Sequence, residues 1–413
     1  MEVSPFPHQG PLEPNQVKGR DDLIADLTER ITQRRVTALL GPRRFGKTSA
    51  LTRVADDMAR AGTSVLWVDL YEVTSTADLA RRFDTALAAT QGPLRSRLGT
   101  IAATVGLNLG FLRADFARRR DERPDPDAVL ATLVDTLVAG ATDTPTVVMF
   151  DEFPGIDRVT GAAGLLRTKL QHHFQQIGLV FAGSQPSLMR AMFSERARPF
   201  YAQADLVPIA PFSVAAVHDI VADGFHMTGR DPGDLPGAIF SFAGGHPYRT
   251  MQAADVAWRT TAPGAAHHRR IWDTALASLR AETDLANEAI FSGFATSEKA
   301  VLRLLAGGER LFGTAAELLG VSTGSAQTAR DNLVDAGDLT TERGARLPGA
   351  ARHEPRWIRS EPGGRRPSGW QFVPALTPQG SAEARRACRR RGRPRWRRSR
   401  RRRDRRGAPR AWR

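Results

Sequence analysis

The segment Gly41-Pro42-Arg43-Arg44-Phe45-Gly46-Lys47-Thr48 is the strongest indication of the fold class of this chain. It matches the pattern GxxxxGK[ST], in which glycines let the backbone wrap so that successive N–H groups point at phosphate oxygens. An apolar run over residues 36–40 precedes it, and apolar residues recur at helical spacing over residues 51–58. A strand, a loop and a helix are the context that the pattern requires, whereas a Gly-rich turn with a solvated lysine is the alternative. The candidate nucleotide-binding residues here are Gly41, Pro42, Arg43, Arg44, Phe45, Gly46, Lys47, Thr48 and Ser49.

A second apolar strand, residues 146–150, ends at the acidic pair Asp151 and Glu152. Open α/β sheets bind ligands at the carboxyl ends of their strands. We expect Lys47 to contact the β- and γ-phosphates and Thr48 and Asp151 to hold Mg²⁺. Glu152 is then placed to orient and deprotonate the attacking water. An ordinary solvated helix cap is the alternative for the two acids.

A third apolar strand, residues 178–182, leads to Gly183, Ser184 and Gln185. A polar residue at this point can lie between the acids and the γ-phosphate, so Ser184 is the first candidate and Gln185 the second. A serine that caps the following turn is the alternative. Asp69 also follows a strand; a structural role is expected for it, and a part in catalysis is the alternative. The guanine-reading pattern NKxD does not occur, which favours adenine and therefore ATP.

The composition is that of a globular protein, with 41% hydrophobic residues in 413. The net charge is +15, but 17 arginines and one acid lie between Arg385 and Arg413, so the remainder is nearly neutral. The tail is either a polybasic arm for nucleic-acid phosphates or the product of GC-rich coding sequence read past a lost stop or in a shifted frame. Cys388 is the only cysteine, which excludes an intrachain disulfide and suits a reducing cytoplasm. No apolar run approaches the ~18 residues that span a bilayer, so we expect no membrane association.

Six motifs together resemble those of a known family. They are Lys18-Gly19-Arg20-Asp21, the phosphate loop, Asp151-Glu152, Gly183-Ser184, Arg198-Pro199-Phe200-Tyr201 and Gly244-Gly245-His246-Pro247-Tyr248. Over residues 17–347 the chain resembles the archaeal-type AAA+ ATPases of the STAND group of P-loop NTPases. The resemblance implies an α/β fold, a parallel sheet with helices on both faces, followed by a helical lid and a C-terminal winged helix-turn-helix.

The resemblance also implies a function and further site residues. It implies an ATP- and Mg²⁺-dependent switch that self-associates into a homo-oligomer or binds a macromolecular partner. Gly19 and Arg20 would lie near the adenine, and His246 and Pro247 would approach the nucleotide from the lid. From the residues alone, His246 is either a phosphate ligand or a structural histidine in a Gly-Pro turn.

One departure concerns arginines. The family often has an arginine after the aromatic pair, where this chain has Ala202-Gln203-Ala204. In this chain either Arg196 or Arg198 would take the catalytic or intersubunit role of that arginine, or no residue would. Surface charges are the alternative for both arginines.

The expected domains are an ATPase domain over residues 1–208 with an insertion at 91–126, a helical lid at 209–290, a winged helix-turn-helix at 291–347 and an irregular Arg-rich tail at 348–413. Alternation around Val105 and Leu107 predicts a strand or hairpin in the insertion. Gly224 is expected to break a lid helix. The winged module should contain helices at 298–306, 314–319 and 325–336 and a wing at 339–347.

Three classes of function are compatible with parts of this sequence. The first is the ATPase switch with an unidentified partner. The alternative is a DNA-binding transcription regulator or adaptor that uses the winged helix and the basic tail, with a vestigial nucleotide site. The basic and acidic residues of 295–347 nearly balance, so DNA binding by that module alone would be weak. A metabolic kinase is the third class, and Glu152 argues against it.

Overall fold

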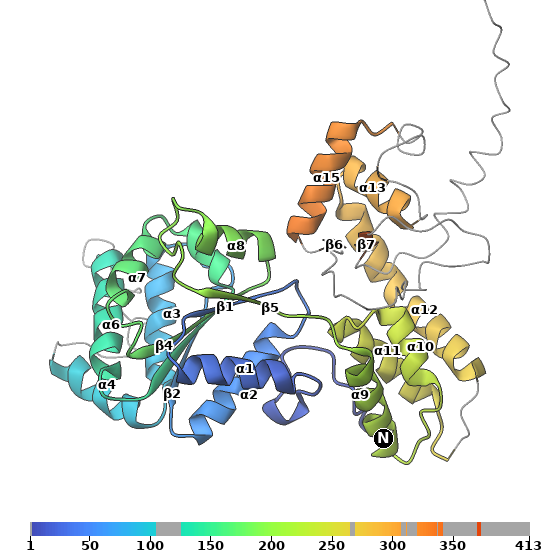
Figure 1. Cartoon of the computed structure of the whole chain (residues 1–413), viewed down its shortest axis with the longest axis horizontal. Helices are drawn as coiled ribbons and strands as arrows, with labels where there is room; N and C mark the ends of the chain where they lie inside the picture. Colours follow the sequence, from blue (N-terminus) through green and yellow to red (C-terminus); the bar gives the residue numbers. More distant parts are fainter. Residues whose placement is uncertain are drawn as a thin grey trace, which may run out of the picture.

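Five parallel strands form the central sheet of the computed structural model, in the order β2-β3-β4-β1-β5 (Figure 1). The structure describes residues 2–104, 125–264, 269–306, 311, 320–336, 338–341 and 370–372. The strands are β1 (Thr37–Leu40), β2 (Ser64–Asp69), β3 (Thr146–Asp151), β4 (Ile177–Gly183) and β5 (Asp205–Pro208). Since parallel neighbours need crossover connections, helices must pack on the faces of such a sheet.

Helices cover both faces of the sheet. On one face α1 (Asp21–Thr32) and α2 (Lys47–Arg60) pack against β1, β3 and β4. On the other face lie α3 (Thr76–Ala89), α6 (Pro126–Ala141), α7 (Ala162–Leu170) and α8 (Pro186–Ser194), and α4 (Pro93–Thr104) packs on α6. Strands β1, β3 and β4 are buried along their whole length, which is why they read as continuous apolar runs. The expected P-loop fold class is confirmed.

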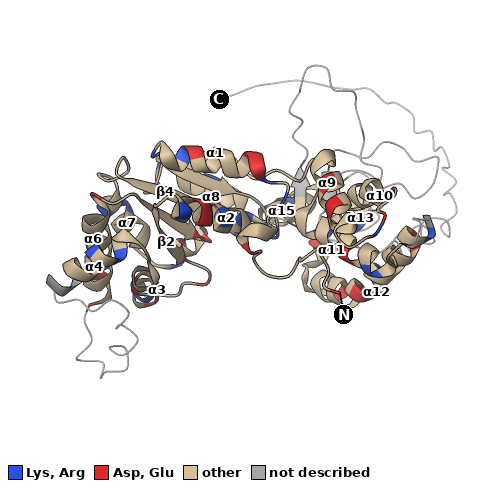
Figure 2. Cartoon of the chain, turned by 90° about the horizontal axis from the view of Figure 1, so that it is seen from below, with Lys and Arg blue, Asp and Glu red and all other residues tan. Residues whose placement is uncertain are grey.

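The ends of α1 suit the helix dipole. Asp21 and Asp22 lie in its first turn and Arg30 in its last, and Figure 2 shows the opposite charges at the two ends. Acids near a helix N-terminus and bases near its C-terminus each contribute roughly 0.3–1 kcal/mol. This arrangement stabilises the helix that follows the segment containing Gly19 and Arg20.

Four helices follow the sheet and build a separate core. They are α9 (Val214–His226), α10 (Leu235–Ala243), α11 (Pro247–Thr260) and α12 (Arg269–Gly293). The expected break at Gly224 is wrong, since α9 runs through it to His226. Gly224 is instead a contact position, because a Cβ there would lie 2.3 Å from the Phe6 ring.

The C-terminal described elements are α13 (Thr296–Ala306), α15 (Thr323–Ala336), β6 (Leu339–Thr341) and β7 (Trp370–Phe372). Two helices and the first wing strand lie where the sequence places them, and β6 pairs antiparallel with β7, for which no fold was expected. The expected helix at 314–319 lies outside the described residues. The winged helix-turn-helix therefore stays a prediction.

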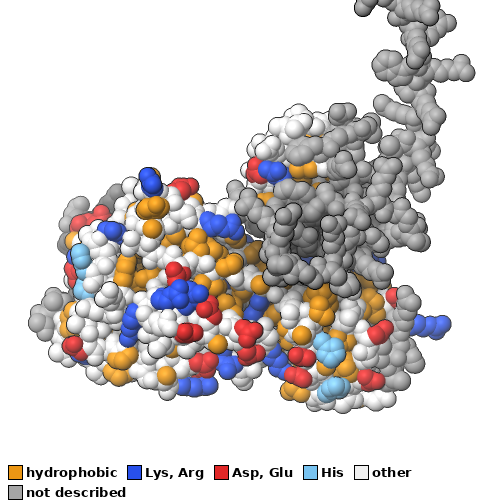
Figure 3. Space-filling model, in the orientation of Figure 1, with side chains coloured by type: hydrophobic (Ala, Val, Ile, Leu, Met, Phe, Trp, Pro, Cys, Tyr) orange, Lys and Arg blue, Asp and Glu red, His pale blue; other side chains and the backbone are white. Residues whose placement is uncertain are grey.

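The expected insertion begins as a helix, since α4 occupies residues 93–104. The strand or hairpin predicted around Val105 and Leu107 lies outside the described residues. In the described ranges no helix is both long and apolar enough to cross a bilayer. Side chains of both signs lie side by side on the face seen in Figure 3, between patches of hydrophobic side chains.

Candidate nucleotide-binding site

The phosphate loop connects β1 to α2, as its sequence predicts. Gly41 lies against Ile209, the residue after β5. A Cβ at Gly41 would lie 2.1 Å from Ile209 Cγ2, so a larger residue would clash there. Gly46 has φ 81° and starts α2 from a left-handed backbone. Arg44 also has a positive φ, 63°. The loop therefore curls over the N-terminus of α2, where backbone N–H groups lack helical partners and attract anions.

Lys47 is the buried cation of this loop, with 5% of its surface exposed. Its Nζ donates to the carbonyl oxygens of Gly41 (2.8 Å) and Pro42 (2.9 Å). Burial lowers the pKa of Lys47 to about 8, against the opposing charges of Glu152 and Asp151. The ammonium is thus held inside the loop by weak acceptors that an anion can replace.

Thr48 and Asp151 bring two oxygen atoms together, 103 residues apart in sequence. Thr48 Oγ1 donates to Asp151 Oδ2 at 2.8 Å, and Asp151 Oδ1 accepts from the N–H of Glu152 at 3.0 Å. Burial raises the pKa of Asp151, while the hydrogen bond from Thr48 opposes the rise. A hydroxyl and a carboxylate are ligands that Mg²⁺ prefers, and the ion usually takes its other ligands from phosphates and water. In the described part of the chain no cluster of three or more His, Cys, Asp or Glu could hold a metal by itself.

Glu152 and Ser184 contact each other directly. Glu152 Oε2 accepts from Ser184 Oγ at 2.7 Å and from the N–H of Ser184 at 3.1 Å. Glu152 has φ 48° and ψ 44°, a left-handed backbone that costs a non-glycine residue about 1 kcal/mol or more. The carboxylate is thereby aimed across to β4, and Ser184 is 5% exposed. Gln185, the second candidate, is exposed and precedes α8.

Arg20 lies where the phosphate loop meets the segment that leads into α9. Its Nη1 donates to Ala210 O at 2.6 Å, its Nη2 donates to Phe45 O at 3.2 Å, and its guanidinium lies 4.4 Å from the Phe212 ring centroid. Burial lowers the pKa of Arg20 to about 10. Gly19, with φ 67°, packs so tightly on α9 that a Cβ would lie 2.9 Å from Ile220. Arg20 therefore connects the phosphate loop to the segment before α9 by hydrogen bonds to backbone carbonyls of both.

His246 and Pro247 begin α11, and they do so beside the phosphate loop. The His246 ring lies edge-on to Phe45 with centroids 4.8 Å apart, and its Nδ1 accepts from the N–H of Arg249 at 3.5 Å. Burial, and then the charge of Arg249, lower the pKa of His246 to about 4. The ring is neutral at pH 7, which fits the structural alternative of a capping histidine.

Two cations lie beside His246: Arg44 is expected from the phosphate-loop motif, whereas Arg249 was missed at the level of the sequence. Arg249 is largely buried with a lowered pKa, and its side chain contacts Gln252 Oε1 at 3.2 Å. Arg44 of the phosphate loop lies 4.5 Å from the ring centroid of Tyr248. The signal was an arginine directly after the motif that ends at Tyr248, but only the fold brings it to the loop. Positive charge collects here at the boundary between loop and α11.

Three further arginines named from the sequence make contacts outside the cluster of Lys47, Thr48, Asp151 and Glu152 or are exposed. Arg198 donates to Asp157 Oδ2 at 2.9 Å and lies 3.6 Å from Glu195, which fits the surface-charge alternative. Arg196 is exposed. Arg43 lies over Tyr71 at 5.8 Å.

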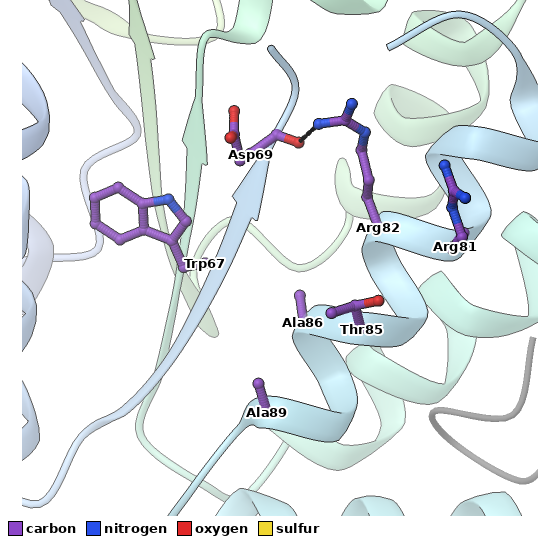
Figure 4. Close-up of a pocket in the computed structure, with 7 residues that line it drawn as sticks. All are labelled: Trp67, Asp69, Arg81, Arg82, Thr85, Ala86 and Ala89. Carbon is purple, nitrogen blue, oxygen red and sulfur yellow. Dashed lines mark hydrogen bonds between the residues drawn. The ribbon is translucent and has the colours of Figure 1, made fainter. Parts of the chain in front are cut away.

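A shallow cavity of about 310 Å³ lies at the β2 edge of the sheet, against α3 (Figure 4). Asp69 contributes to it, but the Asp69 carbonyl accepts from Arg82 at 2.7 Å and its carboxylate accepts from the N–H of Tyr71 at 2.8 Å. These bonds shape the turn after β2, so a structural role for Asp69 agrees with the geometry. The remaining lining residues are Trp67, Arg81, Thr85, Ala86 and Ala89.

No protein-family profile matches the sequence, and no curated protein matches it. Among solved structures, the Walker-type ATPase of Pyrococcus abyssi is similar, with a TM-score of 0.59 at 16% identity over 82% of this chain and 95% of that one. The ORC2 protein of Aeropyrum pernix in its ADP form gives 0.45 at 17% identity over 80% and 83%. A RuvB mutant of Thermotoga maritima gives 0.40 at 13% identity over 82% and 93%. The first likeness shows that the chain shares the fold of that Pyrococcus protein, which agrees with the P-loop fold that the motifs predict.

Proposed function

We propose that this chain binds ATP with Mg²⁺ at the phosphate loop and hydrolyses it as a switch of AAA+ type. The observation that carries the proposal is the 2.8 Å contact between Thr48 Oγ1 and Asp151 Oδ2 beside the buried ammonium of Lys47. Two hard oxygens next to one cation suit a divalent ion bound to phosphate oxygens. The name of the similar Pyrococcus protein, a Walker-type ATPase, supports the same chemistry.

Each side chain has a definite task in this proposal. The Lys47 ammonium exchanges the carbonyls of Gly41 and Pro42 for β- and γ-phosphate oxygens. Thr48 and Asp151 would hold Mg²⁺, which when bound draws charge from the phosphate oxygens. Glu152 accepts a proton from the attacking water as the water oxygen bonds to the γ-phosphorus and the bond to the β-phosphate oxygen breaks, giving ADP and phosphate.

Ser184 acts on this step through Glu152. Two hydrogen bonds to Oε2 orient the carboxylate and leave Oε1 as the oxygen that faces the water's proton. Ser184 is therefore a positioning residue in this scheme. A direct contact between Ser184 and the γ-phosphate is the other role expected for it, and it would require the serine to exchange one acceptor for another.

We further propose that residues 1–208 form the ATPase domain, 209–290 its lid, 291–347 a winged helix-turn-helix and 348–413 a tail. Nucleotide would couple the lid to self-association, with exposed Arg196 available to a second copy. A protein partner is favoured over DNA, because Arg330 is the one basic residue of α15 and pairs with Asp331. The single cysteine, Cys388, favours a reducing compartment such as the cytoplasm.

The test is calorimetric titration of ATP into the whole chain with and without Mg²⁺, followed by turnover and size-exclusion chromatography on the same sample. Lys47→Ala should abolish binding, while the control Lys169→Ala, a half-buried lysine paired with Asp135, should not. Absence of binding in monodisperse wild-type protein, or equal affinity in Lys47→Ala, would overturn the proposal. Salt-dependent binding to duplex DNA that survives Lys47→Ala would favour the regulator instead.

A further inference from the structure

We infer that residues 2–17 are a strap that ties the helical lid to the phosphate-loop helix and limits how fast nucleotide leaves. The end marked N in Figure 1 lies beside α9, and the blue chain runs from there to the sheet. The segment contacts both parts of the molecule, and nothing in its own sequence signals a site. The inference rests on the proposed nucleotide binding.

The first anchor of the strap lies in the core of the lid. Phe6 is 1% exposed and packs 5.8 Å from the Phe225 ring. The Phe6 ring packs directly on the backbone of Gly224, because a Cβ at that position would lie 2.3 Å from a Phe6 ring atom. Glu2 adds an ion pair of 2.9 Å to Arg230, whose side chain is 7% exposed. A buried aromatic ring and a half-buried ion pair hold this end on α9 and its neighbours.

The second anchor lies on α2, directly after the phosphate loop. The N–H of Leu12 donates to Ser49 Oγ at 3.1 Å, and Arg53 donates to Pro14 O at 3.3 Å. Val17 is 6% exposed in the core beneath α1 and α2. Ser49 is adjacent to Thr48, and its hydroxyl can accept from Leu12 while donating its own proton to a phosphate oxygen. The strap therefore orients a hydroxyl of the candidate nucleotide site.

Between the anchors, the strap passes the start of α11. The His8 ring lies 5.8 Å from that of Tyr248, and Arg44 of the phosphate loop lies 4.5 Å from the same tyrosine ring. The chain from Phe6 to Leu12 spans at most roughly 20 Å when fully extended. The lid therefore cannot move far from α2 unless one anchor is released. Phe45 and Arg44 of the phosphate loop contact His246 and Tyr248 at the start of α11, so such a movement would separate the lid from the loop that we propose binds nucleotide.

The first experiment measures dissociation of a fluorescent ADP from the whole chain. Phe6→Ala should release nucleotide about tenfold faster or more, since a buried aromatic anchor carries more free energy than a tenfold change requires. The milder Phe6→Leu, which tests the same anchor if Phe6→Ala does not fold, should give a smaller increase. Two controls should stay near the wild-type rate. They are Leu279→Ala, which opens a cavity on α12 in the same hydrophobic core without removing a strap side chain, and Val3→Ala, which changes an exposed strap residue. Equal rates in the Phe6 variants and Leu279→Ala would overturn the inference.

The second experiment needs no nucleotide, so it separates failure of the strap from failure of the proposed function. Spin labels at Met227→Cys and Ala61→Cys, in a Cys388→Ser background, report the distance between lid and sheet domain. Both label sites are exposed, Met227 at 74%. Phe6→Leu should broaden and lengthen the distance distribution, whereas Leu279→Ala should leave it unchanged. An unchanged distribution in Phe6→Leu would refute the strap even if nucleotide binds as proposed.

Discussion

ATP affinity should fall steeply above pH 8, because the ammonium that meets the phosphates is buried. Lys47 is 5% exposed and its pKa is lowered from 10.5 to about 8. The gap between these values corresponds to roughly 3 kcal/mol of lost preference for the charged form. Triphosphate oxygens beside Nζ restore that preference, so the pKa of Lys47 in the complex lies above its value in the free protein.

The sign and size of the effect follow from this difference. Below pH 8 the free protein already carries the proton, and pH has little influence on binding through Lys47. Above pH 8 binding must take up a proton, so the dissociation constant rises about tenfold per pH unit, or about thirtyfold between pH 7 and pH 9.5. Near pH 8 about half a proton should be taken up per nucleotide bound.

Calorimetry in buffers of different ionisation enthalpy measures both quantities. Lys47→Arg is the matched control, because a guanidinium stays charged throughout this range and should give weaker but pH-independent binding. A wild-type affinity that is flat from pH 7 to pH 9.5, in protein that remains folded, would refute the account of Lys47.

Three further predictions concern other residues. Glu152→Gln should slow single-turnover hydrolysis by about a hundredfold or more while ATP affinity changes little, and unchanged turnover would remove Glu152 as the base. Ser184→Ala should lower kcat about tenfold with KM nearly unchanged, and Ser184→Thr should rescue it, since the hydroxyl only positions the carboxylate; equal losses in both variants would speak against positioning. The pKa of His246 is lowered from the ordinary 6.5 of an imidazole to about 4 in the folded protein, so unfolding takes up a proton between these values and stability should fall as pH drops from about 6.5 to 4. Denaturant midpoints of His246→Gln should lack this part of the pH dependence, and an identical profile in the variant would contradict the assignment.

The phosphate loop, the acidic strand, and the strand and helix on either side of the loop could be predicted because each depends on residues that are neighbours in the sequence. Gly46 can adopt the left-handed backbone that starts α2. The apolar runs predict strands buried on both faces, and apolar residues at helical spacing predict the buried side of α2. The break expected at Gly224 failed for a physical reason. A glycine can allow a close packing contact as well as a turn. The Phe6 ring occupies the space that a Cβ at Gly224 would fill.

Distances within a short stretch of chain are set by backbone geometry, so the phosphate loop with Lys47 and Thr48 could be found in the sequence. Asp151 could be found because it follows an apolar strand, and ligands bind at the carboxyl ends of such strands. The contacts of Phe6 with Gly224 and of Arg20 with Ala210 were decided only by the tertiary structure. These pairs lie about 200 residues apart, and whether they meet depends on how whole helices pack, which local spacing does not encode.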